Sequence, residues 1–231
     1  MDTEEFLPPV TAAFAESVGP TPDDVVREMD ARAEREGFPT VGPAVGGWLR
    51  LLVRAVDAER VFEFGSGFGY SAYWMAPALP PDGDLVLTEV DEDELTDARE
   101  YLERGGYADR ARFEAGDALA TVERYDGPFD LVLLDHEKQR YAEAFEAVRE
   151  KVPVGGLVCA DNAMTAGPIE FDALRELVGT ASPEPADTSD VDTTDATRGI
   201  ADYLETVRTD AAFETTLLPL GEGLSVSIRI N

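Results

Sequence analysis

The sequence has few of the residues that make disulfides and soft metal sites. It contains one cysteine, Cys159, which excludes an intramolecular disulfide and a zinc cluster of cysteines. Cys159 lies in the apolar run GGLVCA, so we expect a buried core thiol. The one histidine, His136, excludes a histidine-rich transition-metal site, and we interpret it as a packing or hydrogen-bonding residue.

Long apolar runs are also missing. None approaches the roughly 20 residues that a helix needs to cross a membrane. The acidic start MDTEEFLPP has no basic and apolar signal pattern. We therefore expect a cytoplasmic protein with no membrane partner.

Basic residues are scarce as well. The chain has 19 Lys and Arg against 48 Asp and Glu, a formal net charge of −29, and its only lysines are Lys138 and Lys151. Such a chain repels itself at ordinary ionic strength, whereas molar salt shortens the Debye length to about 3 Å. This composition predicts a halophilic protein, with an acidic protein of an ordinary cell as the alternative. It argues against a nucleic-acid partner, which requires a basic phosphate-binding face.

Strand and helix patterns alternate through the middle of the 231 residues. Strands are predicted at 60–64, 85–88, 111–114, 129–134 and 156–160, and helices at 70–78, 92–104, near Leu119 and at 141–151. This alternation predicts an α/β, Rossmann-like, doubly wound parallel sheet. The length fits one domain, residues 1–231. A closing hairpin is predicted from 213–218 and 224–230 across PLGEG.

Segments at both sides of this repeat have their own patterns. N-terminal helices are predicted within residues 1–56: one at 21–37 capped by Thr21, and one at 44–56 with Trp48, Leu51, Leu52 and Val56 as its apolar face. The acidic segment 181–197, ASPEPADTSDVDTTDAT, has little to bury, so we expect a mobile loop. A helix over 200–208 should follow it.

The first chemical motif is EFGSGFGYS, residues 63–71, which follows a strand and opens a helix. Glycines at such a turn allow a cofactor to approach the backbone. Their positions, Gly65, Gly67 and Gly69, differ from the usual dinucleotide spacing and favour an S-adenosylmethionine binder. A nicotinamide enzyme and a merely structural turn remain the alternatives.

Two further acidic residues follow the next strands. Glu89 ends the second strand, where a carboxylate can accept hydrogen bonds from both ribose hydroxyls of a nucleoside. Its alternative is a solvated surface carboxylate. Asp117 follows the third strand, and it could accept from an adenine amino group or cap the short helix after it.

Polar residues at the ends of the fourth and fifth strands suggest a metal site. Asp135 comes from LLDHEKQRY, and Asp161 with Asn162 from CADNAMTAG. Three oxygen ligands suit Mg²⁺ or a similar divalent cation, although each aspartate could simply cap a helix. Lys138, retained three residues after Asp135 in a chain with two lysines, indicates a base rather than an ordinary surface residue.

The order and spacing of five motifs resemble those of the catechol and caffeoyl-CoA O-methyltransferase family, over roughly residues 41–231. The motifs are EFGSGFGYS, TEVDED, GDALATV, LLDHEKQRY and ADNAMTAG. The resemblance implies the fold of class I S-adenosylmethionine methyltransferases: seven strands with the last one antiparallel. It also implies a homodimer. The implied cofactor-binding residues are Val41, Gly42, Glu63, Gly65, Gly67, Tyr70, Ser71, Glu89, Asp117 and Asp135.

The same resemblance implies Asp135, Asp161 and Asn162 as metal ligands and Lys138 as the catalytic base. It predicts methyl transfer to a hydroxyl of a small aromatic vicinal diol. Glu137 and Ala166 depart from the bulky wall residues of the catechol enzymes, and their late second acidic contact to substrate has no evident counterpart. The alternatives are a tRNA wobble-uridine hydroxyl methyltransferase of the same family, a nicotinamide-dependent oxidoreductase and a non-catalytic nucleoside-binding module.

Overall fold

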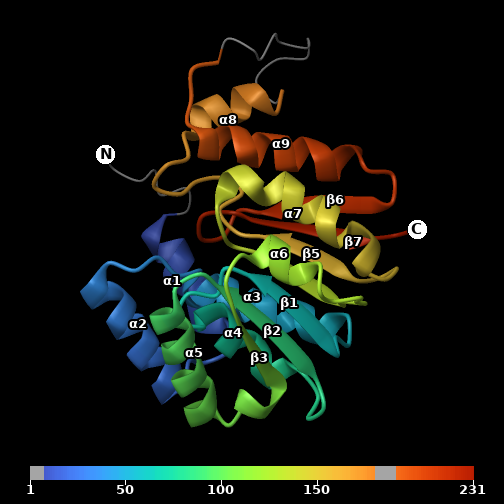
Figure 1. Ribbon diagram of the computed structural model, residues 1–231. Coiled ribbons are helices and arrows are strands. Elements are labelled where there is room, and N and C mark those ends of the chain that lie inside the picture. Colours follow the sequence, from blue (N-terminus) through green and yellow to red (C-terminus); the bar gives the residue numbers. More distant parts are fainter. Residues whose placement is uncertain (1–7, 180–190) are drawn as a thin grey trace.

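Seven strands form one sheet at the centre of the computed structural model, which describes residues 8–179 and 191–231. The strand order is β3-β2-β1-β4-β5-β7-β6 (Figure 1). Neighbouring strands among β1 to β5 are parallel, and β7 pairs antiparallel with both β5 and β6. The strands are β1 (Arg60–Phe64), β2 (Asp84–Glu89), β3 (Ala111–Ala115), β4 (Leu131–Leu134), β5 (Leu157–Ala160), β6 (Phe213–Leu218) and β7 (Leu224–Arg229). The predicted doubly wound sheet with an antiparallel last strand is confirmed.

Helices cover both faces of the sheet. One face packs against α2 (Asp24–Glu36), α3 (Gly42–Ala55), α4 (Tyr70–Met75) and α5 (Glu92–Gly105). The other packs against α6 (Ala118–Val122), α7 (Tyr141–Val148), α8 (Phe171–Leu177) and α9 (Asp195–Thr209). Short 3₁₀ turns follow some of these elements: η1 (Ala76–Ala78), η2 (Ala108–Arg110), η3 (Lys138–Arg140) and η4 (Arg149–Lys151). Because side chains alternate along a strand, Leu131 and Leu133 enter one core and Val132 and Leu134 the other.

The N-terminal helices correct two predictions. Asp23, not Thr21, caps α2, because its carboxylate accepts from the backbone N–H groups of Val25 and Val26. The buried face of α3 is the stripe Val45, Leu49 and Val53, one helical turn apart. The predicted face of α3 is therefore wrong in part, since Trp48 is 38% exposed and Leu51 is 53% exposed.

The helix α1 (Pro9–Val18) is not predicted by the sequence pattern. It lies beside the exposed side of α3, and the two helices together line a groove of about 880 Å³. Neither α1 nor any other helix in the described residues is long and apolar enough to cross a membrane.

The acidic segment 181–197 is loop only in part. Thr194 caps α9, which begins at Asp195, so the last three residues of the predicted loop are helical. Thr197 is fully buried and its hydroxyl accepts from the Glu170 backbone N–H at 2.9 Å, which explains why the helix extends this far. Residues 181–190 of the predicted mobile loop lie outside the described residues. The preceding helix, α8, is not predicted by the sequence pattern either.

Candidate functional site

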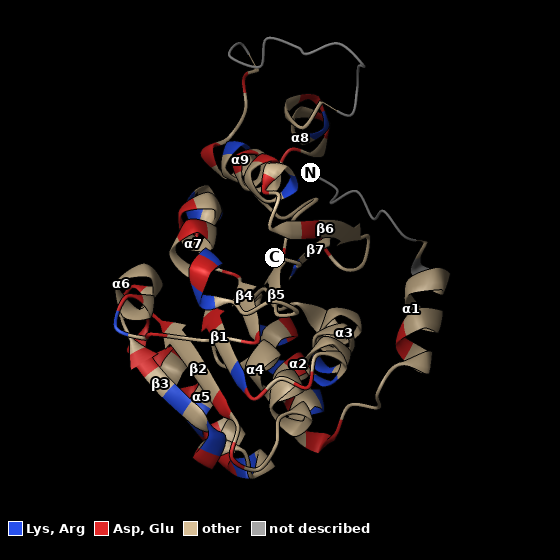
Figure 2. Ribbon diagram, turned by 90° about the vertical axis from the view of Figure 1, so that its right-hand side faces the viewer, with Lys and Arg blue, Asp and Glu red and all other residues tan. Residues whose placement is uncertain are grey.

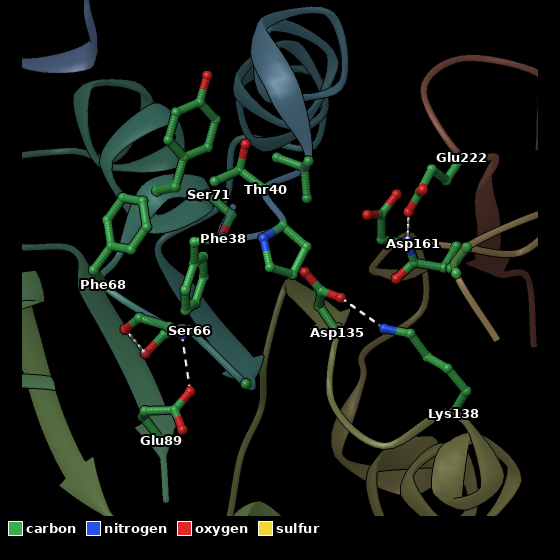
Figure 3. A pocket seen from close by; sticks show the side chains of 18 of the residues that line it. Phe38, Thr40, Ser66, Phe68, Ser71, Glu89, Asp135, Lys138, Asp161 and Glu222 are labelled. Carbon is green, nitrogen blue, oxygen red and sulfur yellow. Dashed lines mark hydrogen bonds and ion pairs between the residues drawn. The ribbon is translucent and has the colours of Figure 1, made fainter. Parts of the chain in front are cut away.

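A cavity of about 510 Å³ opens at the carboxyl ends of the parallel strands. This edge is where open α/β sheets bind ligands. Figure 3 shows side chains around it from the loop after α2, the turn after β1, the end of β2 and the segments that follow β4 and β5. Predicted site residues that line the cavity are Val41, Gly65, Gly67, Tyr70, Ser71, Glu89, Asp135, Lys138, Asp161 and Asn162. The lining does not include Gly42, Glu63 or Asp117.

Backbone conformation and close packing both require glycine at the turn after β1. Gly65, Gly67 and Gly69 have φ angles of 79°, 48° and 83°, which side-chain-bearing residues rarely adopt. A Cβ atom at Gly67 would lie 2.8 Å from the ring of Phe38, which comes from the loop after α2. The turn therefore passes beneath the Phe38 loop with no space for a side chain.

Glu89 is held in a fixed orientation at the end of β2. Its Oε2 accepts from the Gly67 N–H at 2.9 Å (Figure 3), and its Oε1 accepts from the N–H groups of Val90 and Asp91 at 2.7 and 3.0 Å. Because the carboxylate is already ordered, it can accept further hydrogen bonds from a ligand's hydroxyl groups at little entropic cost. Glu89 therefore lines the cavity, and its contact with a ribose stays a prediction.

Glu63 lies below the turn rather than in the cavity lining. It is fully buried, and the Ser71 hydroxyl donates to its Oε1. Its Oε2 has no hydrogen-bond partner among the described residues. Burial raises the pKa of Glu63 to about 8, so near neutral pH this carboxyl is largely protonated.

Asp117 is absent from the cavity lining and caps α6. Its Oδ1 accepts from the Ala120 N–H at 2.8 Å, and Arg140 donates to its Oδ2. This arrangement favours the cap over the adenine contact. Gly42 is likewise absent from the lining and instead is the first residue of α3, next to the lining residue Val41.

The other end of the cavity gathers Asp135, Asp161, Asn162 and Lys138 (Figure 3). The Lys138 Nζ donates to Asp135 Oδ1 at 2.9 Å and to the hydroxyl of Tyr141 at 2.9 Å. Burial raises the pKa of Asp135, although Lys138 opposes this effect. The two lysine contacts place the Nζ at the cavity surface between the sheet edge and α7.

Asp161 is the most strongly desolvated carboxylate of this group. Asp161 is only 4% exposed, and its Oδ1 has no hydrogen-bond partner among the described residues. Burial and the neighbouring Asp135 carboxylate raise the pKa of Asp161 to about 8. An unpaired buried oxygen beside a second carboxylate fits a divalent cation. No three histidine, cysteine or acidic side chains in the described chain are placed to hold a metal, so such a site depends on the Asn162 amide.

Glu222 is a cavity residue that sequence reasoning missed. It lies in the turn between β6 and β7, and the Asn162 amide donates to its Oε2. The turn is anchored because the N–H groups of Met164 and Thr165 donate to the Glu222 carbonyl at 3.1 and 3.0 Å. The motif PLGEG predicts the turn, but nothing in it indicates that its tip folds back against Asn162. Phe38 and Thr40 from the loop after α2 also line the cavity without having been predicted.

His136 is a packing residue. Its ring stacks on Tyr141 with centroids 5.2 Å apart and contacts Phe64 at 5.3 Å. Neither ring nitrogen has a hydrogen-bond partner among the described residues, so the hydrogen-bonding alternative is not supported. Burial, followed by the charge of Lys138, lowers the pKa of His136 to about 3, so it stays neutral at ordinary pH.

Comparison with known proteins decides the family. A model of the O-methyltransferase family matches residues 24–230, which is nearly the whole chain. The chain belongs to this O-methyltransferase family. It is an S-adenosylmethionine-dependent O-methyltransferase.

Relatives of this O-methyltransferase include both branches that the motifs resemble. The catechol O-methyltransferase of Niastella koreensis is 33% identical over 154 residues, which cover 64% of this chain and 69% of that protein. Caffeoyl-CoA O-methyltransferase 3 of Nicotiana tabacum is 26% identical over 225 residues, which cover 92% of this chain and 85% of that protein. The structure of an O-methyltransferase from Bacillus cereus in complex with SAH shares the fold, with a TM-score of 0.78, 23% identity and coverage of 95% of this chain and 97% of that one.

Proposed function

We propose that this O-methyltransferase transfers a methyl group to a hydroxyl of a small aromatic vicinal diol, with a divalent cation at the acceptor end of its cavity. One observation carries the proposal. The cavity has an ordered carboxylate, Glu89, and the glycine turn at one end, and Lys138 with Asp135 and Asp161 at the other. A methyl donor and a hydroxyl acceptor can therefore bind side by side.

The donor end is assigned to S-adenosylmethionine. Glu89 would accept from the ribose hydroxyls, and the turn from Gly65 to Gly69 would give the ligand access to the backbone. Tyr70, Ser71 and Val41 complete that wall. When bound, this ligand supplies an electrophilic methyl group on a sulfonium sulfur.

The acceptor end is assigned to the diol and the cation. Asp135, Asp161 and Asn162 would hold Mg²⁺ or a similar ion, which would supply a Lewis acid that lowers the pKa of an acceptor hydroxyl. Support comes from the unpaired Oδ1 of Asp161 and from the two adjacent carboxylates. Without a cation, the Asp161 Oδ1 is a buried oxygen that has no partner among the described residues.

Lys138 would act as the base. Its neutral amine takes the proton of the acceptor hydroxyl, and an oxygen electron pair forms the new bond to the methyl carbon. The carbon–sulfur bond breaks, and its electron pair remains on the sulfur of S-adenosylhomocysteine. Alignment of donor and acceptor within one cavity supplies much of the acceleration.

The charge of the cavity favours a small free diol over a CoA ester. Lys138 is the one basic residue in the described lining, against the carboxylates Glu89, Asp135, Asp161 and Glu222. The sequence between Arg175 and Arg198 adds no lysine or arginine. A CoA ester or a tRNA carries phosphates that this lining would repel.

A homodimer is also proposed, through α1 and α3. Val10, Phe14 and Val18 form one helical stripe on α1 and are 78%, 69% and 72% exposed. Trp48 and Leu51 of α3 are exposed beside the same groove. Figure 2 shows α1 standing out at one side of the molecule, where a second copy could cover it. Sedimentation should give a dimer for the native chain and a monomer for Phe14→Asp, and a native monomer would contradict this proposal.

The charge distribution supports a salt-rich cytosol as the working environment. The red segments that mark Asp and Glu residues are spread over several helices of the ribbon in Figure 2, and the chain carries a formal net charge of −29. A high salt concentration would screen their mutual repulsion.

The proposed function is tested with a 1,2-dihydroxyaromatic probe. Dialysis against EDTA should abolish methyl transfer, and added Mg²⁺ should restore it, while calorimetry shows nearly unchanged binding of S-adenosylhomocysteine. Metal content is measured on the same samples. Full activity in metal-free protein would overturn the cation part of the proposal. Faster turnover of caffeoyl-CoA than of the free diol would overturn the substrate assignment.

A further inference from the structure

Tyr141 is the first residue of α7 and lies three residues after Lys138. It is fully buried, and its hydroxyl accepts from the Nζ of the cavity residue Lys138 at 2.9 Å. The same Nζ lies 5.1 Å from the centroid of the Tyr141 ring. The second acceptor of Lys138 is Asp135 Oδ1 at 2.9 Å (Figure 3). One neutral and one carboxylate acceptor therefore hold the amine.

We propose that Tyr141 is a positioning residue that holds the Lys138 Nζ toward the acceptor end of the cavity. The inference rests on the proposed role of Lys138 as the base. A lysine side chain has four rotatable carbon–carbon bonds and about 2 kcal/mol of rotamer entropy, so a free amine would occupy many positions. A fixed acceptor on the protein confines it to one.

The hydroxyl of Tyr141 is suited to this role because its ring is fixed on two sides. His136 stacks on the ring with an interplanar angle of 17°, and Tyr203 packs edge-on with centroids 5.7 Å apart. Burial holds the pKa of Tyr141 well above its ordinary value, so the hydroxyl is neutral. A neutral acceptor keeps the amine in place without the charge attraction of a carboxylate.

Asp135 alone cannot supply this positioning in the proposed enzyme. The same carboxylate is a proposed cation ligand, so its contact with Lys138 competes with a second use. Tyr141 does not line the cavity, and within the described residues its hydroxyl is hydrogen-bonded to Lys138 alone. Its hydroxyl is therefore committed to Lys138.

The experiment compares Tyr141→Phe with two reference variants. Tyr141→Phe keeps the buried ring and removes one oxygen. Tyr203→Phe is the matched control, because it keeps the buried ring that packs on Tyr141 and removes a hydroxyl that makes no hydrogen bond to Lys138 in the described structure. Lys138→Met marks the loss of the base itself. We expect kcat to fall by a factor of about ten in Tyr141→Phe, the scale of one lost hydrogen bond, with the KM for both substrates nearly unchanged. Tyr203→Phe should keep the native kcat.

A second measurement does not depend on turnover. With two lysines in the chain, protein labelled with ¹⁵N and ¹³C in lysine gives two side-chain signals by NMR. Lys151 is the internal reference, since its Nζ donates to the Val122 carbonyl at 2.7 Å. The Lys138 ε-carbon and ζ-nitrogen signals should shift in Tyr141→Phe and stay in place in Tyr203→Phe, while those of Lys151 move in neither variant.

The outcomes separate this inference from the proposed function. An inactive Lys138→Met with a native kcat and unshifted Lys138 signals in Tyr141→Phe would overturn the positioning role and leave Lys138 as the base. An active Lys138→Met would overturn the base and, with it, the positioning role. In the native protein, Lys138 ζ-protons that exchange as fast as those of free lysine would also contradict a held amine.

Discussion

The α-carbon of Gly65 faces the backbone carbonyl of Asp135, so that a Cβ atom at Gly65 would lie 2.4 Å from that oxygen. Gly65 belongs to the turn after β1, at the proposed donor end, and Asp135 follows directly on the neighbouring strand β4, at the proposed acceptor end. The two halves of the cavity thus share one packed backbone contact. A change at the donor turn should be transmitted directly to the acceptor end.

Gly65→Ala tests this contact. Gly106→Ala is the matched control, because Gly65 and Gly106 have φ angles of 79° and 76°, yet a Cβ at Gly106 would meet nothing within 4 Å. Both variants bear the strain of a left-handed alanine, on the order of 1 kcal/mol. Only Gly65→Ala should also lose affinity for S-adenosylhomocysteine, because the added Cβ must displace the turn. We expect a factor on the order of ten or more. Equal affinities in calorimetry would contradict the packing argument.

Glu89→Ala should weaken binding of S-adenosylhomocysteine by a factor on the order of ten or more, because a charged hydrogen bond contributes about 1.5–3 kcal/mol. Glu89 also holds the Gly67 N–H, so Glu89→Gln is a useful companion that retains an acceptor oxygen. We expect it to lie between the native protein and the alanine variant. Unchanged affinity in a folded Glu89→Ala would remove this residue from the donor site.

The sequence predicts those parts of the site whose residues lie at the ends of strands. Glu89 is the last residue of β2, and Asp135 and Asp161 follow directly on β4 and β5; the carboxyl ends of such parallel strands meet at one edge of the sheet. Their convergence could therefore be predicted. Asp117 also follows a strand, but its carboxylate caps α6 and accepts from Arg140, and no local pattern indicates the contact with Arg140.

Long-range contacts explain the remaining errors. Glu222 reaches the cavity only because its turn is hydrogen-bonded to residues 164 and 165, far away in sequence. The exposed side of α3 looks like a buried face because Trp48 and Leu51 are apolar, while the face that packs inward uses Val45 and Leu49. Hydrophobic pattern alone does not distinguish a core face from a face that another helix or chain could cover.

Glu63→Gln should reveal the buried proton below the turn. The folded pKa of Glu63 is about 8 against an ordinary value of 4.5. Between these two pH values the folded chain keeps a proton on Glu63 that the unfolded chain has released. The contribution of Glu63 to the free energy of unfolding therefore falls as pH rises. Glutamine resembles the protonated form and does not titrate. The stability of the variant relative to native should therefore increase from pH 4.5 to 8 and level off above. The exposed Glu103→Gln is the control, and a constant difference in urea midpoints across this range would refute the prediction.

Salt should stabilise the fold strongly. The net charge of −29 repels itself in dilute buffer, and molar KCl reduces the Debye length to about 3 Å. We expect the melting temperature to rise from dilute buffer to molar KCl. Substituting KCl by the same osmolality of sucrose distinguishes charge screening from solvent exclusion. A melting temperature that does not change between the two salt concentrations would count against the halophilic assignment.

Gly199→Ala should lower activity by displacing the backbone of Lys138 rather than its side chain. Gly199 lies within α9, where alanine ordinarily stabilises a helix by about 1 kcal/mol relative to glycine. Here a Cβ atom would lie 2.5 Å from the Lys138 carbonyl and 2.3 Å from the α-carbon of Gln139, so η3 or α9 must move.

We therefore expect alanine to destabilise the protein here, which should lower the melting temperature. The value of kcat should fall by a factor on the order of ten, because a displacement of about 1 Å at a reacting group can reduce the rate by more than that. Asp202→Ala, on the exposed side of the same helix, should leave kcat unchanged. The Lys138 NMR signals should shift in Gly199→Ala alone. A more stable Gly199→Ala with native kcat would mean that the backbone of η3 is free to move away, and that Lys138 is held by its side-chain contacts alone.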